Sequence, residues 1–121
     1  MNKPHAASLE ELSPHQVAAL LQARQILLVD VREPDEYAAQ RIHGAVLFPL
    51  STLDALALPP DGPRRVVFQC GSGKRSAMAA QAWIAAGVSR AAHLAGGIGA
   101  WKSAGLPTLQ LDPATGKTAS S

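Results

Sequence analysis

The stretch RVVFQCGSGKRSAMAAQAWIAAG, residues 65–87, carries two secondary-structure elements and a sharp connection between them. Residues 65–69 form a short apolar run of the kind found in buried strands, and the run leads directly into Cys70. Residues 76–86 are rich in alanine, which favours a helix, and Gly87 is a typical helix end. The cysteine is therefore predicted to lie on a strand-to-helix turn.

The same alternation continues on both sides of this stretch. Residues 26–31 are apolar without alternating polarity, as expected of a strand buried on both faces of a parallel sheet. Helices are predicted from capping and proline signals over residues 13–23 and from Pro34 to about His43. Further predicted elements are a strand over 45–48, a short helix capped by 51–54, a proline-rich turn at 59–63, a strand over 91–94 and a helix from Gly96-Gly97 to Gly105.

This order predicts an α/β fold: a single domain with a mostly parallel sheet of four to five strands and helices on both faces. The length of 121 residues is that of one domain. We expect the domain to span residues 9–108, with a flexible N-terminus over 1–8 and a flexible polar tail over 109–121. Ligands in such folds bind beyond the carboxyl ends of the strands, which is where Cys70 and Asp30 lie.

Charge and composition exclude several classes of protein. Apolar residues make up 47% and charged residues 17%, which is a globular balance. The net charge of +2 is too small for a protein that tracks nucleic-acid phosphates, but residues 1–60 carry a net −3 and residues 61–121 a net +5. The second half should therefore prefer anions. No apolar run is long enough to span a membrane, so we expect a soluble, cytoplasmic protein with no membrane partner.

Cysteine and histidine usage argues against a metal site, and the reaction expected below requires no cofactor. Cys70 is the single cysteine, which excludes an internal disulfide and a thiolate-rich zinc site. The four histidines show no spacing typical of metal ligands. We interpret His43 and His93 as packing or surface residues, and Trp83 and Trp101 as core residues.

The loop Cys70-Gly71-Ser72-Gly73-Lys74-Arg75-Ser76 places a thiol, two glycines and two cations at the start of a helix. Glycines allow successive backbone N–H groups to point inward and form an anion-binding concavity. The helix end and the cations are expected to lower the pKa of the thiol and make it a nucleophile. The alternative is that Cys70 is a small apolar residue that ends a strand.

Two phosphate-binding motifs do not fit this loop. A Walker loop needs glycine five residues before Gly73 and serine or threonine after Lys74, where this chain has Phe68 and Arg75. The dinucleotide fingerprint needs a third glycine at the position of Ser76.

The chain resembles the rhodanese family of sulfurtransferases over residues 9–108. The resemblance is carried by four motifs in the family's order: LVDVREPDEY at 28–37, RIHGA at 41–45 with Pro49, the loop at 70–76, and GGIGAW at 96–101 with AGLP at 104–107. Arg41 and Leu47 depart from the family, which usually has His and often Asn there.

The resemblance implies roles for individual residues. Cys70 would accept sulfur, the backbone of residues 71–76 would hold the substrate anion, and Arg75 would close the loop. Asp30 and Arg32 would belong to a polar framework beneath the site. The implied reaction moves a sulfane sulfur from a small anionic donor to a cyanide or thiol acceptor through a Cys70 persulfide. The loop resembles those of both mercaptopyruvate and thiosulfate sulfurtransferases. We expect thiosulfate as the donor, because it carries two negative charges and the second half of the chain is net +5. A protein of a sulfur relay is a further expected partner.

Two rival functions remain open at this point. Cysteine phosphatases and arsenate reductases of the same fold also use a loop with Cys and Arg, but the phosphatase loop holds five residues between them, whereas this chain holds four. A non-enzymatic persulfide carrier or redox sensor would use the same thiolate.

Overall fold

The protein is represented by a computed structural model that describes residues 8–53, 64–88, 90–112 and 114–120. The elements in chain order are β1 (Ser8–Leu12), α1 (Pro14–Gln22), β2 (Ile26–Asp30), α2 (Pro34–Ala39), β3 (Gln40–Arg41), β4 (Val46–Leu47), the 3-10 helix η1 (Leu50–Thr52), β5 (Arg65–Gln69), α3 (Lys74–Ala85), β6 (Arg90–Leu94), α4 (Gly97–Ser103), β7 (Leu109–Leu111) and β8 (Thr118–Ser120).

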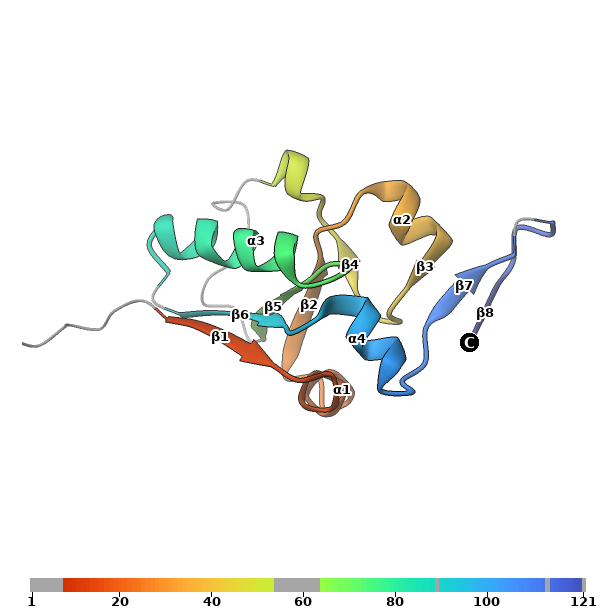
Figure 1. The fold of residues 1–121 in the computed structure, drawn as a ribbon, viewed down its shortest axis with the longest axis horizontal. Helices are drawn as coiled ribbons and strands as arrows, with labels where there is room; N and C mark the ends of the chain where they lie inside the picture. Colours follow the sequence, from red (N-terminus) through yellow and green to blue (C-terminus); the bar gives the residue numbers. More distant parts are fainter. Residues whose placement is uncertain (1–7, 54–63, 89, 113, 121) are drawn as a thin grey trace, which may run out of the picture.

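The main sheet has five parallel strands in the order β1-β6-β5-β2-β4. It lies at the centre of the molecule, with α3 on one side and α1 and α4 on the other (Figure 1). The predicted parallel α/β sheet with helices on both faces is confirmed. In the register of β2 and β5, Asp30 pairs with Gln69, so Asp30 and Cys70 emerge side by side at the carboxyl edge.

Alternate residues of the strands fill two apolar cores, one on each face. Leu28 and Val67 point to the core that contains Val17 of α1 and Trp101 of α4. Val29, Phe68 and Cys70 point to the other core, against α3. There the rings of Phe68 and Trp83 meet edge to face at 5.5 Å, and Trp83 is 3% and Trp101 4% exposed. Both tryptophans are core residues, as predicted.

The main sheet contains a strand that the sequence did not reveal. β1 pairs with β6 along its whole length, from Ser8 with Arg90 to Leu12 with Leu94. The strand carries two adjacent glutamates and lies at the edge of the sheet, so its apolar pattern is weak, and pairing with β6 holds it in place. α3 also begins at Lys74, two residues before the predicted start at Ser76. The predicted turn at 59–63 and the end of the segment 51–54 lie outside the described residues.

The tail beyond residue 108 differs from the flexible segment that we expected. β7 and β8 pair in an antiparallel hairpin, and β7 also pairs with β3. The connection is closed by backbone hydrogen bonds at Asp112, whose carbonyl accepts from the N–H of Gly116 at 2.7 Å. This hairpin is held by main-chain pairing more than by buried apolar side chains, so the polar composition of the segment gave no sign of it.

Candidate active site

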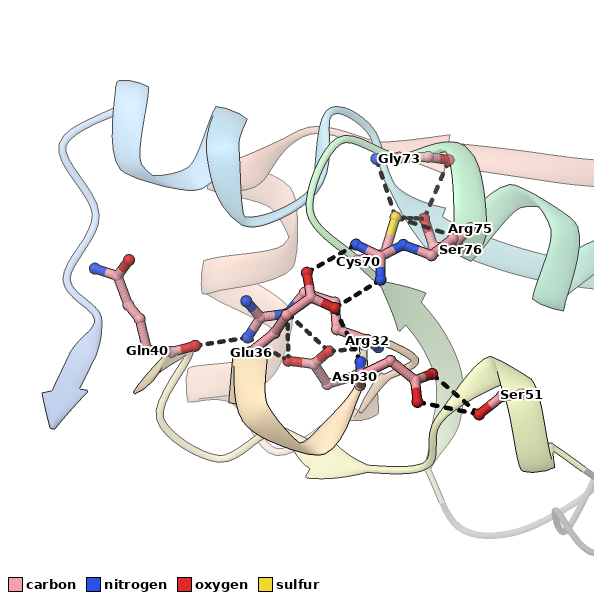
Figure 2. Close-up of polar contacts among 10 residues, drawn as sticks. Asp30, Arg32, Glu36, Gln40, Ser51, Cys70, Gly73, Arg75 and Ser76 are labelled. Carbon is pink, nitrogen blue, oxygen red and sulfur yellow. Dashed lines mark hydrogen bonds and ion pairs between the residues drawn. The ribbon is translucent and has the colours of Figure 1, made fainter. Parts of the chain in front are cut away.

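The candidate site is centred on Cys70, which follows β5 and is fully buried. Its Sγ accepts the backbone N–H of Gly73 at 3.1 Å and that of Ser76 at 3.2 Å. The hydroxyl Oγ of Ser76 lies 3.5 Å from the same sulfur (Figure 2). The loop therefore curls around the sulfur atom and points hydrogen-bond donors at it.

These donors favour the charged form of the thiol. Burial is the largest single influence and by itself raises the pKa of Cys70, but hydrogen bonds from the Ser76 hydroxyl and from backbone N–H groups of Ser76, Gly73 and Ser72 outweigh it. The pKa of the thiol consequently lies below its ordinary value, as predicted. The main source is this set of donors at the start of α3, whereas the sequence had also pointed to the two cations.

The two cations of the loop have different surroundings. Arg75 makes a bidentate pair with Glu36 of α2, at 2.7 Å and 3.0 Å. These hydrogen bonds raise the pKa of Arg75, and the charge of Cys70 adds a smaller rise, so the guanidinium lies close enough to interact with the thiolate charge. Arg75 in turn is the largest cause that lowers the pKa of Glu36 to about 2. Lys74 is exposed to solvent.

The far side of the loop is fixed by the start of α4. The N–H of Ile98 donates to the carbonyl of Cys70 at 2.8 Å, and that of Gly99 donates to the carbonyl of Gly71 at 3.0 Å. Gly97 makes this approach possible, because a Cβ there would lie 2.1 Å from the Cys70 carbonyl oxygen. Gly73 has φ +100°, a left-handed conformation that favours glycine and turns the loop into α3.

Asp30 and Arg32 form a buried pair beside this loop. The Asp30 carboxylate accepts from Nε of Arg32 at 3.0 Å and from its Nη2 at 2.9 Å, and it also accepts the backbone N–H of Arg32. Arg32 donates further to the carbonyl of Gln40 at 2.6 Å. The pair thus joins the end of β2 to β3, and Figure 2 shows it beneath the Glu36–Arg75 pair.

The structure brings most of the predicted residues together, but with distinct surroundings. Gly73 and Ser76 surround the sulfur of Cys70, Arg75 pairs with Glu36, and Ser72 and Lys74 have exposed side chains. Gly71 contributes its backbone, and a Cβ there would lie 3.3 Å from Nη2 of Arg75.

Sequence reasoning missed three residues around the loop. Glu36 lies in the helix predicted from Pro34 and had no predicted role in the site, because its partner Arg75 lies 39 positions away. His93 was interpreted as a packing or surface residue, but its Nδ1 lies 2.8 Å from Ser76 Oγ. Glu11 contacts Nε2 of the same imidazole at 3.2 Å. His93 lies on β6, which is next to β5, and Glu11 lies on β1, which is next to β6, so finding these two residues needed the strand order.

A buried thiol that accepts backbone N–H groups, on a strand-to-helix turn of a parallel α/β sheet, defines a protein built to hold a cysteine anion. Within that class the chain belongs to the rhodanese-like domain family, whose model matches residues 13–104.

Relatives and a solved structure agree with this assignment. An uncharacterized protein of Synechocystis, slr1261, is 41% identical over 99 residues, covering 82% of this chain and 55% of that protein. The thiosulfate:glutathione sulfurtransferase of Saccharomyces cerevisiae is 33% identical, over 71% of each chain. A solved protein of unknown function from Rhodopseudomonas palustris, described as a possible tyrosine phosphatase, is 31% identical with a TM-score of 0.72, covering 85% of this chain and 86% of that one.

The chain spans about half the length of its cyanobacterial relative. The relatives named as sulfurtransferases support sulfur transfer of the rhodanese type. Among the described residues, no helix is long and apolar enough to cross a membrane.

Proposed function

We propose that the chain transfers a sulfane sulfur from thiosulfate to a thiophilic acceptor, cyanide or a thiol, through a persulfide on Cys70. The observation that carries the proposal is the set of donors around Sγ, from Gly73 and Ser76, which lowers the pKa of the thiol although the residue is buried. A thiolate held this way is a nucleophile at neutral pH.

The reaction is a double displacement. The Cys70 thiolate attacks the outer sulfur of thiosulfate, an S–S bond forms to Cys70, and the sulfur–sulfur bond of the donor breaks so that sulfite leaves with its electron pair. Cyanide or a thiolate then attacks the outer sulfur of the persulfide and releases the Cys70 thiolate. The inward backbone N–H groups of the loop stabilise the anionic sulfur at both stages.

The choice of thiosulfate rests on charge. Thiosulfate carries two negative charges and mercaptopyruvate carries one, so a cationic loop mouth favours the former. Arg75 lies close enough for its charge to interact with that of Cys70, and Lys74 lies in the first turn of α3. The yeast relative at 33% identity carries thiosulfate in its name.

The loop length separates this proposal from a phosphatase. Four residues stand between Cys70 and Arg75, one fewer than in cysteine phosphatases of this fold, so the cradle is smaller. Hydrolysis of p-nitrophenyl phosphate that depends on Cys70 should therefore be negligible, even though one solved neighbour is described as a possible tyrosine phosphatase.

The deciding experiment is mass spectrometry of the protein after incubation with thiosulfate. We expect one added sulfur atom on the peptide that contains Cys70, and its loss as thiocyanate after cyanide is added. The Cys70→Ser variant is the control and should gain no sulfur. A wild-type protein that gains no sulfur, or that hydrolyses the phosphate ester faster than it transfers sulfur, would contradict the proposal.

A further inference from the structure

His93 is a buried, titratable residue that the reaction described above does not use. Its side chain lies on β6 and the residue is 2% exposed. Nδ1 lies 2.8 Å from Ser76 Oγ, and Nε2 lies 3.2 Å from a carboxylate oxygen of Glu11. Ser76 Oγ itself is 3.5 Å from Cys70 Sγ. A continuous chain of polar contacts therefore runs from the buried thiol to an exposed carboxylate.

The strand register explains why these groups meet. His93 pairs with Phe68 of β5 on one side and with Glu11 of β1 on the other. Residues paired across parallel strands point to the same face, which here is the face covered by α3. Phe68 and Cys70 are two positions apart, so they share this face, and Ser76 of α3 packs over it.

We propose that His93 acts through Ser76 as the proton acceptor for the Cys70 thiol, and that Glu11 fixes the imidazole in the tautomer that can accept. His93 is thus a positioning residue for the thiolate. The inference rests on the proposed function, because there the Cys70 thiolate is the attacking group.

When Cys70 is a thiol, the hydrogen-bond donors and acceptors from Cys70 to Glu11 match this assignment. The Glu11 carboxylate can only accept, so the neutral imidazole carries its proton on Nε2 and donates it to Glu11. Nδ1 is then a bare acceptor for the Ser76 hydroxyl, and the Ser76 oxygen in turn can accept the thiol proton. Each group has a partner of the right kind.

The thiolate state follows from two short proton shifts in the same geometry. The S–H bond breaks, its electron pair stays on sulfur, and the proton passes to Ser76 Oγ while the former Ser76 proton passes to Nδ1. The products are a thiolate that accepts from the Ser76 hydroxyl and an imidazolium that faces the Glu11 carboxylate. No heavy atom has to leave its place, and no further reactant is needed.

The groups around the His93 ring come from three parts of the chain. The groups that face its ring are Glu11 from β1, Ser76 from α3 and, beyond Ser76, the Cys70 sulfur. Glu10, the neighbouring acid on β1, instead pairs with Arg65 and Arg90. Glu10 is therefore a matched control for Glu11.

The test measures how the alkylation of Cys70 by iodoacetamide depends on pH, because the rate follows the thiolate fraction. His93→Asn keeps an acceptor near Ser76 but cannot take up a proton. We expect its half-maximal rate about one pH unit higher than in wild type, which is about tenfold slower alkylation at pH values below both midpoints. Glu11→Gln should give a smaller rise, because this carboxylate is exposed.

Glu10→Gln and His43→Asn, which change a half-buried and an exposed residue outside this chain of contacts, should keep the wild-type profile. Alkylation needs no sulfur donor, so a failure of sulfur transfer would leave this test intact.

A second measurement does not disturb His93 at all. Imidazole ¹⁵N shifts in the Cys70→Ser variant should show the neutral ring protonated on Nε2 and bare on Nδ1. A ring protonated on Nδ1 would overturn the proposal, since it could not accept from Ser76. A His93→Asn profile that coincides with wild type, or a Glu11→Gln profile that matches Glu10→Gln, would overturn it equally.

Discussion

Asp30 and Cys70 have similar positions in the main sheet but different hydrogen-bond partners. Both are fully buried and lie at the carboxyl ends of neighbouring parallel strands. Asp30 is met by a full positive charge two residues away, and Arg32 supplies a backbone and two side-chain donors to it. Cys70 is met by neutral backbone donors, a hydroxyl, and a guanidinium that is held mainly by Glu36.

The difference separates an anion that supports the fold from one that can react. A carboxylate locked to its own arginine has no lone pair or charge to offer a ligand, because its partner neutralises it. A thiolate stabilised by neutral donors keeps its charge and its nucleophilic electron pair. Parallel strand ends thus provide places for anions, and the type of partner decides what each anion does.

The largest effect should come from Cys70→Ser. We expect no measurable thiosulfate:cyanide sulfur transfer, because an alcohol at neutral pH is a far weaker nucleophile than a thiolate and cannot carry persulfide sulfur. Circular dichroism and the thermal unfolding midpoint should stay close to wild type. Turnover by this variant would mean that the sulfur at the end of β5 does not react.

Asp30→Asn should lower the stability of the fold and leave most of the sulfur transfer intact, the opposite of Cys70→Ser. It leaves the buried Arg32 charge without its carboxylate, so the free energy of unfolding should fall by about 3–5 kcal/mol in urea titrations. Sulfur transfer per folded molecule should stay within about tenfold of wild type. Asp35→Asn, an exposed acid on α2, is the control and should change stability by less than about 1 kcal/mol. Loss of activity without loss of stability in Asp30→Asn would place Asp30 among the reacting groups.

Glu36→Gln tests the half-exposed ion pair between Glu36 and Arg75, for which we expect a smaller effect than for Cys70 or Asp30. The pKa of Glu36 is lowered from its ordinary 4.5 to about 2, so its contribution to stability is present above pH 4.5 and is lost as the pH falls toward 2. The variant should be less stable at pH 7 by under about 1 kcal/mol, since solvent screens the pair. Urea midpoints measured from pH 7 to pH 2 should converge with wild type at the acid end. A constant difference across that range would mean that the ion pair is not its source.

Lys74→Ala should give the smallest effect. Because Lys74 is exposed, its charge acts through solvent, and we expect the ratio of kcat/KM for thiosulfate to that for mercaptopyruvate to fall only a few-fold at low salt. Added salt should lower the wild-type ratio toward that of the variant. Lys117→Ala, an exposed cation of the C-terminal hairpin, is the control. An unchanged ratio, or a wild-type preference for mercaptopyruvate, would show that charge does not select the donor.

The sequence predicts well what local signals encode. Ser13 and Gln16 form the expected capping box of α1, and the apolar runs at β2 and β5 lead to Asp30 and Cys70 at the same edge. Contacts between distant segments could not be predicted in this way. The pairs Glu36 with Arg75 and Ser76 with His93 depend on the strand order and on the direction of side chains. The hairpin of β7 and β8 escaped prediction for a related reason, since main-chain pairing leaves little trace in composition.

The contact between α4 and the cysteine loop has a consequence for how the protein is made. Cys70 and Gly71 depend on N–H groups of Ile98 and Gly99, so the loop takes its final shape only after a segment synthesised much later has docked. On a ribosome, the growing polypeptide would carry a cysteine loop without these two hydrogen bonds until that moment. For the same reason, residues 70–76 grafted alone onto another strand-to-helix turn would lack the two hydrogen bonds that fix the carbonyls of Cys70 and Gly71. The complete site therefore consists of two segments, the cysteine loop at 70–76 and the glycine-rich segment at 96–99.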